Sequence, residues 1–269
     1  MPELPEMETY KRLLSPRVAG QMITGAEVQR PKSLNVDVEQ FQRVVVHNRV
    51  MSIERRAKHL LFQLASGHVL VLHLMLGGWM FFGRDEDKPN RTVQVRLSFG
   101  ERHLHFIGLR LGYLHLHTLP DALQLLSKLG PEPLHPGFDE QQLRKVLAGR
   151  RTNLKMTLVD QSVLSGIGNC YSDEICFYGG LMPTRRVSDL DDNELTRLYR
   201  SIRAVLTEAI DYGGYMEEPL YIGEDLSGGY NDRCKVYDNE GAPCLRCGHS
   251  IVKAEVSSRK CFYCANCQA

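Results

Sequence analysis

The last 36 residues of the chain carry two pairs of cysteines whose spacing restricts the folds available to this segment. Cys244 and Cys247 form one C-x-x-C pair, Cys264 and Cys267 form another, and 16 residues separate the pairs. Two such pairs supply four thiolates to one tetrahedral zinc ion. The segment is too short to build a core of its own. We therefore predict a zinc finger with one structural ion, because four cysteines leave no ligand position open.

The second pair has an alternative register, since Cys261 and Cys264 also stand at C-x-x-C spacing. We favour Cys264 and Cys267 as the ligands and expect Cys261 to be a bystander. The other cysteines have no partner at ligand spacing, and we expect them to be small buried hydrophobic residues: Cys170, Cys176 and Cys234.

The start of the chain does not resemble a secretory signal, because acidic residues stand at positions 3, 6 and 8. The most apolar stretch, 69–82, is interrupted by His73 and a Gly-Gly pair and is too short to span a bilayer as a helix. We expect a cytoplasmic, nucleoid-associated protein that does not bind membranes. Its eight cysteines would stay reduced there, which agrees with a metal site rather than disulfides.

A length of 269 residues suggests about two domains at ~150 residues each. With 43% hydrophobic and 24% charged residues, the composition excludes collagen-like and disordered classes. Helical spacing of apolar residues follows Pro5 and extends to about Leu14, and strand-like segments with turn signals then run from Met22 to about His117. The sequence therefore predicts an α+β fold that begins with one helix and a β-rich domain.

The second half of the chain changes to helical periodicity after a proline-rich stretch. Helices are expected over 139–147, 169–178 and 191–212, followed by a glycine-rich acidic loop at 214–232. The predicted organisation is a β-rich domain (1–120), a linker (121–138), a helical domain that includes the acidic loop (139–233), and the cysteine-rich unit (234–269).

The net charge of +1 hides an uneven distribution of basic residues. They cluster at 43–58, at 141–159, which includes Arg151 and Lys155, and in the cysteine-rich tail. One such cluster is usually a solvated face, but one in each structural unit is typical of a surface that follows nucleic-acid phosphates. The glycines of Ser165-Gly166-Ile167-Gly168-Asn169 precede a helix start, which suits either an anion site or a tight turn between helices.

Several motifs, in order along essentially the whole chain, resemble the formamidopyrimidine-DNA glycosylase/endonuclease VIII family. They are Pro2-Glu3-Leu4-Pro5-Glu6, Arg55-Arg56-Ala57-Lys58-His59-Leu60-Leu61, Gly130-Pro131-Glu132-Pro133-Leu134, Gly166-Ile167-Gly168-Asn169 and the ending from Pro243-Cys244 to Cys267-Gln268. The resemblance implies a two-layer β-sandwich N-terminal domain, a helix-two-turns-helix domain and a four-cysteine zinc finger, with DNA held between the domains. The implied activity belongs to base-excision repair.

The N-terminal motif has the chemistry that this activity needs. If Met1 is removed, Pro2 presents a secondary amine. An α-amino group has a pKa of about 7.7–8, so a fraction of this amine is neutral and nucleophilic at physiological pH. Glu3 lies beside it in the sequence and suits proton transfer to the opening sugar or the departing base. By resemblance, Glu6 is a supporting carboxylate. Lys58 corresponds to a lysine that contacts the damaged nucleotide's phosphate and assists elimination.

The resemblance also implies a set of DNA contacts. Asn169 and Arg259 correspond to residues that clamp phosphates around a kinked site, and Lys155 stands where the oxidised-purine branch has a lysine. A base must leave the duplex before a nucleophile reaches C1′, and a wedge must fill the gap. The expected DNA-binding residues are His73, Arg110, Arg151, Lys155, Asn169 and Arg259, and the wedge candidates are Leu76 and Leu111.

Two segments depart from the formamidopyrimidine branch. Leu76 replaces a methionine, and Leu109-Arg110-Leu111 replaces Arg-Arg-Phe, so one arginine is missing and the preferred opposite base is left open. The loop at 214–232 is acidic and has no lysine or arginine. Two interpretations of these acids are left open: they face solvent, or they favour a positively charged base such as a ring-alkylated purine.

The leading interpretation is a monomeric DNA glycosylase and AP lyase that acts on double-stranded DNA. It would remove an oxidised or ring-opened purine through a Schiff base at Pro2 and nick the abasic strand by β,δ-elimination. The alternative is a non-catalytic protein that binds damaged or structured DNA on the same scaffold. The joint presence of Pro2, Glu3, Glu6 and Lys58 favours the enzyme, because a binding protein has no need of an amine–carboxylate pair.

Overall fold

The N-terminal helix forms because its first turn carries a proline and an acidic residue where a helix tolerates them best. In the computed structural model, which describes all residues from 1 to 269, this helix is α1 (Leu4–Val18). Met7, Tyr10 and Leu14 are buried on one face, as their spacing predicts. The helix continues past the expected end at Leu14 and contains Pro16 in its last turn.

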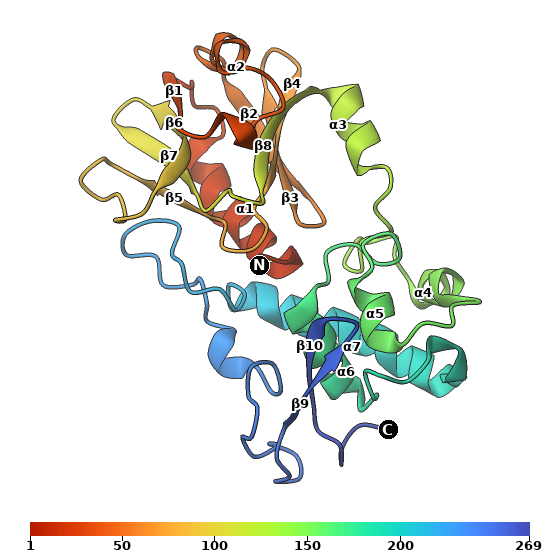
Figure 1. Ribbon diagram of the computed structural model, residues 1–269. Coiled ribbons are helices and arrows are strands. Elements are labelled where there is room, and N and C mark those ends of the chain that lie inside the picture. The colour runs from red at the N-terminus through yellow and green to blue at the C-terminus, as the bar shows by residue number, and fades with distance from the viewer. The chain divides into compact units, whose positions relative to one another are not determined.

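The strands that follow α1 form two antiparallel four-stranded sheets, in the orders β2-β3-β4-β8 and β1-β6-β7-β5 (Figure 1). The first sheet consists of β2 (Val50–Arg56), β3 (His59–Leu64), β4 (His68–His73) and β8 (Tyr113–Thr118). The second consists of β1 (Gly25–Val28), β5 (Trp79–Gly83), β6 (Val93–Phe99) and β7 (Arg102–Ile107). The short elements around them are η1 (Pro31–Ser33), α2 (Val38–Val45) and α3 (Leu119–Leu126).

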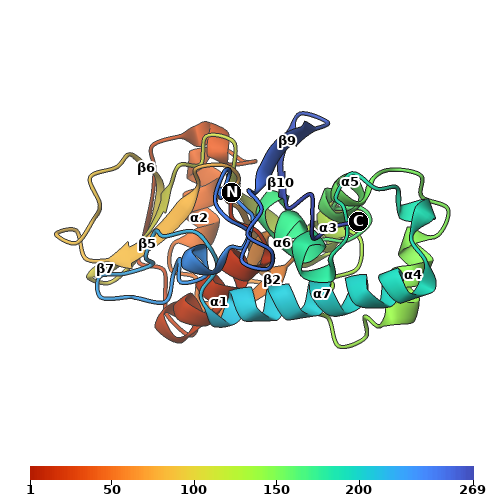
Figure 2. The ribbon, with the colours of Figure 1, turned by 90° about the horizontal axis from the view of Figure 1, so that it is seen from below.

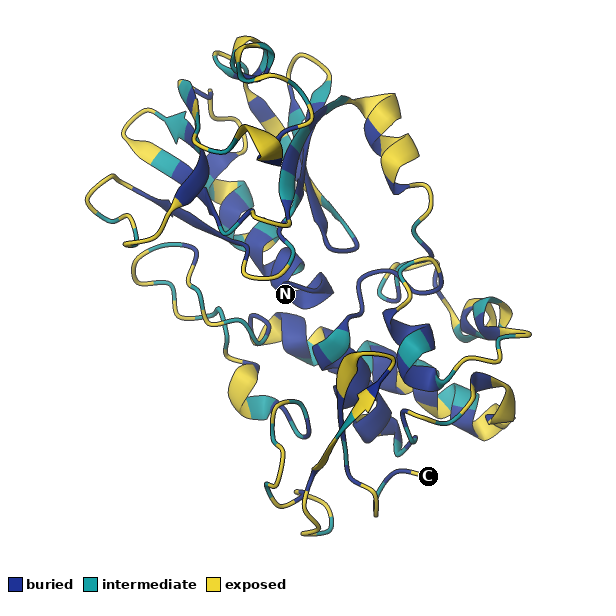
Figure 3. Cartoon of the chain, viewed as in Figure 1, coloured by how far each residue is buried: buried dark blue, intermediate teal, exposed yellow.

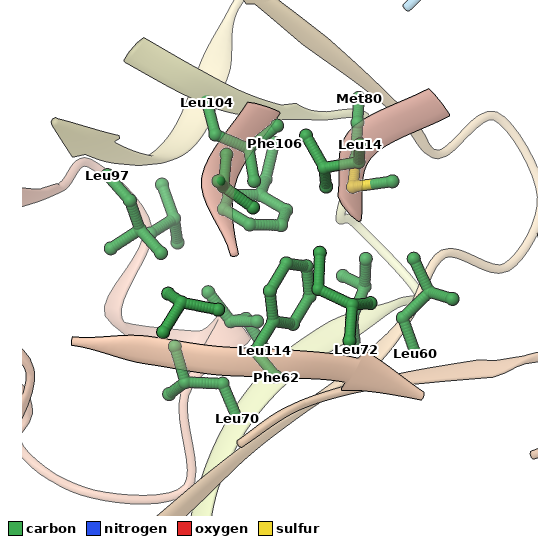
Figure 4. Packing of buried hydrophobic residues seen from close by; sticks show 14 of the residues in the cluster. Leu14, Leu60, Phe62, Leu70, Leu72, Met80, Leu97, Leu104, Phe106 and Leu114 are labelled. Carbon is green, nitrogen blue, oxygen red and sulfur yellow. The ribbon is translucent and has the colours of Figure 1, made fainter. Parts of the chain in front are cut away.

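The core of this region lies between the two sheets and α1. Phe62 from β3 meets Phe106 from β7 edge to face, with ring centroids 6.4 Å apart, and both rings are buried. Leucines from both sheets and Leu14 of α1 surround them (Figure 4). Strand residues therefore alternate between this core and the outer faces, and the predicted helix-plus-sandwich architecture is confirmed.

The helical half contains four α-helices, two short 3₁₀ turns and one hairpin. They are α4 (Glu140–Leu147), α5 (Leu154–Val159), α6 (Asn169–Gly179), η2 (Val187–Asp189), α7 (Asp192–Asp211), η3 (Asn231–Arg233), β9 (Val252–Val256) and β10 (Arg259–Tyr263). Helix α6 packs along α7 and is buried along nearly its whole length (Figures 2 and 3). No helix of the protein is long and apolar enough to cross a membrane.

The chain divides into two compact units. The first unit consists of Met1–Lys128 with Tyr212–Gly229, and the second consists of Leu129–Asp211 with Tyr230–Ala269. The acidic segment, which the sequence placed with the helical domain, thus packs with the first unit. The reason is a buried anchor: Leu220 is fully buried in the sandwich core, and its carbonyl accepts a hydrogen bond of 2.6 Å from the Phe82 N–H.

The acidic segment is also ordered by one of its own carboxylates. Glu224 accepts hydrogen bonds from the N–H groups of Leu220, Leu226 and Ser227, at 2.6–3.1 Å. Nearby, the Arg17 guanidinium lies 3.7 Å from the centroid of the Tyr221 ring. Glu224 therefore shapes its own loop, although the sequence suggested that acids in this segment face either solvent or a ligand.

Candidate active site

The first turn of α1 places the predicted catalytic carboxylates in a buried position. Glu3 is the N-cap residue, and its N–H donates a 2.7 Å hydrogen bond to Glu6 Oε2 in a capping box. Glu3 is 1% exposed and Glu6 is 3% exposed, and Pro2 is buried beside them. A carboxylate held this way is fixed in orientation before any substrate arrives.

The second oxygen of Glu6 holds the segment 212–229. Glu6 Oε1 accepts a 2.9 Å hydrogen bond from the Tyr215 N–H. The neighbouring Gly214 has φ +77°, and a side chain there would collide with Glu6 Oε1. Gly214 therefore has two reasons to be glycine, its positive φ and the close approach of the Glu6 carboxylate.

Tyr215 was not expected at the site from the sequence. Its hydroxyl accepts a hydrogen bond from the Met1 ammonium and donates one to the Met1 carbonyl, both at 3.1 Å. Pro2 nitrogen is an amide while Met1 remains attached, so removal of Met1 is a chemical requirement for a free amine. No sequence pattern marks Tyr215, because its partners are more than 200 residues away.

The turn between β2 and β3 carries Lys58. The lysine is 5% exposed, and Ala57 before it has a φ of +52°, which few residues with a side chain adopt. Arg55 fixes this hairpin to α1, because its Nε donates to Glu8 Oε2 at 2.7 Å and its Nη1 donates to the Ala57 carbonyl at 3.2 Å. An ion pair that the sequence did not reveal thus holds the turn that carries Lys58 against the N-terminal helix.

His73 belongs to a group of stacked rings on the outer face of the first sheet. Its ring lies 4.3 Å from that of His59, whose Nε2 is 3.2 Å from the Tyr113 hydroxyl. Burial lowers the pKa of His59 to about 4 and that of His73 to about 3. Both imidazoles are therefore neutral at physiological pH, so His73 can offer DNA a hydrogen bond but no charge.

The wedge candidates project from two loops that pack backbone to backbone. Leu76 is 67% exposed and Leu111 is 64% exposed. Gly108 has φ +73° and no room for a side chain, because the Gly77 carbonyl lies against it. Arg110, which directly precedes Leu111, is exposed, and Leu109 is fully buried. The two leucines therefore project from loops that support each other through this backbone contact.

In the second unit, the glycine motif is a tight turn before α6. Gly166 has φ +103°, and Gln161 accepts from the Gly166 N–H at 2.9 Å and donates to the Ile167 carbonyl at 2.7 Å. Asn169 is the first residue of α6, and its side-chain oxygen has no hydrogen-bond partner. The motif therefore forms the tight turn before a helix that the sequence offered as one of its two interpretations.

The structure corrects the expected position of Lys155. Its side chain is 0% exposed, and Nζ lies 2.7 Å from Asp173 Oδ1 and 2.8 Å from the Asn169 carbonyl oxygen. Burial raises the pKa of Asp173, and the Lys155 ammonium opposes that rise. Asp173 also accepts from the Phe262 N–H at 3.1 Å. Lys155 thus links α6 to the finger hairpin through Asp173 and does not reach the surface. A run of basic residues in the sequence does not reveal that one of its lysines is buried.

The other predicted phosphate contacts lie at the surface. Arg151 precedes α5 and Arg259 begins β10, and both are exposed. The hairpin turn before Arg259 contains Ser257 and Ser258, both with positive φ. A neighbouring anchor that the sequence did not reveal is Glu174, which accepts from the N–H groups of residues 235, 236 and 237 at 2.8–3.1 Å.

The four predicted zinc ligands converge at the end of the finger. The sulfurs of Cys244, Cys247, Cys264 and Cys267 all lie within 4.8 Å of one another. Two of the Sγ–Sγ distances, 3.8 Å for Cys244–Cys267 and 3.5 Å for Cys247–Cys264, match a tetrahedron whose Zn–S bonds of about 2.3 Å imply edges of roughly 3.8 Å. Cys261 instead points to Asp173, at 3.5 Å from Oδ1. The register chosen from the sequence is therefore the one whose sulfurs converge.

Comparisons with known proteins cover nearly the whole chain. Residues 1–113 match the formamidopyrimidine-DNA glycosylase N-terminal domain, 129–218 match the formamidopyrimidine-DNA glycosylase H2TH domain, and 241–269 match a zinc finger found in FPG and IleRS. A formamidopyrimidine-DNA glycosylase of Pelotomaculum thermopropionicum is 35% identical over 100% of this chain and 99% of its own. The chain belongs to the formamidopyrimidine-DNA glycosylase family. It carries one structural zinc, as the finger match and the four-cysteine cluster agree.

Other relatives give the same result. The formamidopyrimidine-DNA glycosylase of Heliobacterium modesticaldum is 36% identical over 100% of both chains. The Lactococcus lactis Fpg, solved in complex with DNA containing an abasic site, superposes with a TM-score of 0.92 at 29% identity over 99% of each chain. The same protein has been solved with DNA containing N7-benzyl-Fapy-dG, with the same TM-score and coverage. The family expected from the sequence motifs is confirmed.

The zinc ligands can be tested by single substitutions. Cys264→Ala removes one of four thiolates, and we expect zinc content measured by plasma mass spectrometry to fall from about one ion per chain to well below half. Cys261→Ala is the matched control, because it removes a neighbouring thiol outside the cluster and should leave zinc content unchanged. Full zinc in Cys264→Ala, or its loss in Cys261→Ala alone, would show that the register is wrong.

Removal of the Lys155 ammonium from its buried pair with Asp173 should destabilise the protein to an extent that depends on pH. Lys155→Met leaves the Asp173 carboxylate buried and unpaired, which should cost about 3–5 kcal/mol in the free energy of unfolding at neutral pH. Burial raises the pKa of Asp173 above its value of about 4 in the unfolded chain. The folded variant therefore binds more protons than the unfolded variant, so its loss of stability relative to the wild type grows as the pH rises above that value. Urea denaturation at pH 5 and pH 8 measures this. A deficit independent of pH, or larger at pH 5, would contradict the assignment.

Proposed function

We propose that this protein is a DNA glycosylase with AP lyase activity that acts in base-excision repair. Membership of the formamidopyrimidine-DNA glycosylase family supports this activity, and the observation that carries it to these residues is the buried Glu3–Glu6 pair beside Pro2. Its substrate is double-stranded DNA with a damaged base or an abasic site, and it acts as a monomer. Such a substrate places the protein with the chromosome, in the cytoplasm.

Pro2 is the nucleophile once Met1 has been removed. Its nitrogen lone pair attacks C1′ of the damaged nucleotide, the glycosidic bond breaks, and the base leaves with a proton. The sugar ring opens as the C1′–O4′ bond breaks, and loss of the amine proton gives an iminium ion between Pro2 and C1′. Loss of a C2′ proton then expels the 3′ phosphate, and a second elimination expels the 5′ phosphate. Glu3 is the group that supplies and accepts protons in these steps.

Glu6 and Lys58 support this chemistry in different ways. Glu6 does not need to touch the substrate, because its two oxygens already hold the Glu3 and Tyr215 N–H groups. Its role is to fix Glu3 and the segment 212–229. Lys58 stands on a hairpin held to α1 by the Arg55–Glu8 ion pair, and it contacts the phosphate of the damaged nucleotide and assists elimination.

DNA binding uses surface groups of each unit. Leu76 and Leu111 fill the gap left by the everted base, and their exposure of about two thirds, unusual for leucine, supports this role. Phosphates are bound by His73, Arg110, Arg151, Asn169 and Arg259. Lys155 contributes as a positioning residue, because its ammonium holds the first residue of α6 and, through Asp173, the finger hairpin.

The lesion is an oxidised or ring-opened purine. The names of the relatives support this class, since they are formamidopyrimidine-DNA glycosylases, and one relative has been solved with DNA that contains a ring-opened purine. Not every acidic residue of 212–229 is available to a ligand, because the Glu224 carboxylate accepts hydrogen bonds from backbone N–H groups of the same segment. A ring-opened neutral purine is therefore favoured over a cationic alkylated one.

Borohydride trapping on an abasic-site duplex tests the proposed reaction. The wild-type protein with Met1 removed should form a covalent adduct, because borohydride reduces the iminium ion to a stable amine. Glu3→Gln should slow base excision by about 10²-fold or more, because proton transfer is lost while the amine remains. Glu39→Gln is the control, because Glu39 is an exposed carboxylate on α2 that lies outside the reacting groups and their partners. Absence of any wild-type adduct would favour the non-catalytic binding protein instead.

A further inference from the structure

The Tyr215 hydroxyl contacts the amino terminus of the chain, and the proposed reaction does not use this contact. The hydroxyl oxygen accepts a hydrogen bond from the Met1 ammonium, and the hydroxyl donates one to the Met1 carbonyl, both at 3.1 Å and both partly buried. A phenol is therefore held against the end of the chain at which the proposed nucleophile, Pro2, becomes the terminal residue.

Tyr215 holds this position because its backbone is fixed on both sides. Its N–H donates to Glu6 Oε1 at 2.9 Å, and Gly214 before it has φ +77° and no room for a side chain beside that oxygen. Five residues further on, Leu220 is fully buried in the sandwich core. Tyr215 and Pro2 belong to the same compact unit, so their separation does not depend on how the two units are arranged.

The Tyr215 hydroxyl is also close to the Pro2 nitrogen. The Met1 carbonyl oxygen and the Pro2 nitrogen are bonded to the same carbon, so about 2.3 Å separates these two atoms. Because the hydroxyl is 3.1 Å from that carbonyl oxygen, it lies within roughly 5.4 Å of the Pro2 nitrogen. Once Met1 has been removed, a shift of at most about 2.5 Å brings the hydroxyl and the new terminal amine to hydrogen-bond distance.

A hydroxyl at this distance suits the chemistry of a secondary amine. Neutral proline carries one N–H and one lone pair on its nitrogen, and only the lone pair attacks. When the N–H donates to the Tyr215 oxygen, the lone pair points away from the phenol and is available to C1′. As the N–C1′ bond forms, positive charge develops on the nitrogen and its N–H becomes a stronger donor. A hydrogen bond that strengthens in the transition state accelerates the step.

We propose that Tyr215 is a further catalytic residue, whose hydroxyl oxygen accepts the Pro2 N–H and stabilises the positive charge on the attacking nitrogen. The proposal rests on the proposed function, because it requires Pro2 to be the nucleophile. The nitrogen lone pair forms the N–C1′ bond while the bond from C1′ to the base, or at an abasic site to its oxygen, breaks. Tyr215 keeps its own proton throughout. The proton on the nitrogen stays until the iminium ion forms and then passes to Glu3.

Tyr215→Phe removes the hydroxyl and keeps the ring. The measurement is the single-turnover rate of borohydride-trapped adduct formation on an abasic-site duplex, with Met1 removed, between about pH 5 and pH 9, a range that spans the ordinary pKa of an α-amino group. At high pH the rate should fall about tenfold or more, as expected when a hydrogen bond to a charged group is lost. The midpoint of the acid limb should move to lower pH, because the ammonium form of Pro2 loses the same acceptor.

Tyr221→Phe is the matched control. Tyr221 lies in the same segment, but its ring is 3.7 Å from the guanidinium of Arg17, in the last turn of α1. This variant should keep both the rate and the midpoint of the wild type. An unchanged rate in Tyr215→Phe would overturn the proposal. A slower rate with an unchanged midpoint would also overturn it, because Tyr215 would then only support the fold.

A titration of the free protein tests the contact without DNA. In protein labelled with ¹⁵N-proline, the terminal amine of Pro2 is distinct from the amide nitrogens of the other prolines, so NMR reports its pKa directly. That pKa should be lower in Tyr215→Phe than in the wild type and unchanged in Tyr221→Phe. Both variants keep the charged groups on the elements near the amine: Glu3 and Glu6 of α1, Lys58 of the β2–β3 turn, and Glu217 and Glu218 of the segment 212–229.

The two measurements separate failure of this proposal from failure of the proposed function. Equal pKa values of the Pro2 amine in the wild type and Tyr215→Phe would overturn the contact, whatever the wild-type activity. If the proposed function fails, the wild-type protein forms no borohydride adduct at any pH, and a catalytic role for Tyr215 is overturned with it.

Discussion

The carboxylate of Glu6 joins the two stretches of chain on which the proposed chemistry depends. One oxygen accepts from the Glu3 N–H at 2.7 Å, and the other accepts from the Tyr215 N–H at 2.9 Å. Because Glu6 is 3% exposed, both bonds are shielded from water, and an unpaired carboxylate here would be costly. The start of α1 and the distant segment 212–229 are therefore ordered together, and Gly214 is the residue that permits their close approach.

Similar partly or fully buried polar contacts fix the other parts of the site. The Arg55–Glu8 pair holds the Lys58 hairpin against α1, and the Lys155–Asp173 pair holds the start of α6 near the finger hairpin. Such pairs contribute more to geometry than to net stability, because desolvation offsets much of their attraction. Their value to an enzyme is that the reacting groups keep one orientation. The proposed catalytic residues thus depend on partners that never need to touch DNA.

Local sequence signals predicted much of this structure. The two C-x-x-C pairs gave the metal cluster, and the Pro5–Glu6 turn and the apolar spacing gave α1 and the main helices, because these signals act over a few residues. Long-range contacts were beyond such reasoning. Lys155 sits in a basic run yet is fully buried, and residues 212–229 follow a helix of the second unit yet pack with the first through Leu220. Both depend on partners far away in the sequence.

The central claim is that the processed N-terminus is the nucleophile, and the most direct measurement is the mass of the trapped peptide. The wild-type adduct, reduced with borohydride and digested, should yield an N-terminal peptide that lacks Met1 and carries the sugar remnant on the nitrogen of Pro2. Fragment ions locate the modified residue. A remnant on Lys58, or on a peptide that retains Met1, would contradict the account.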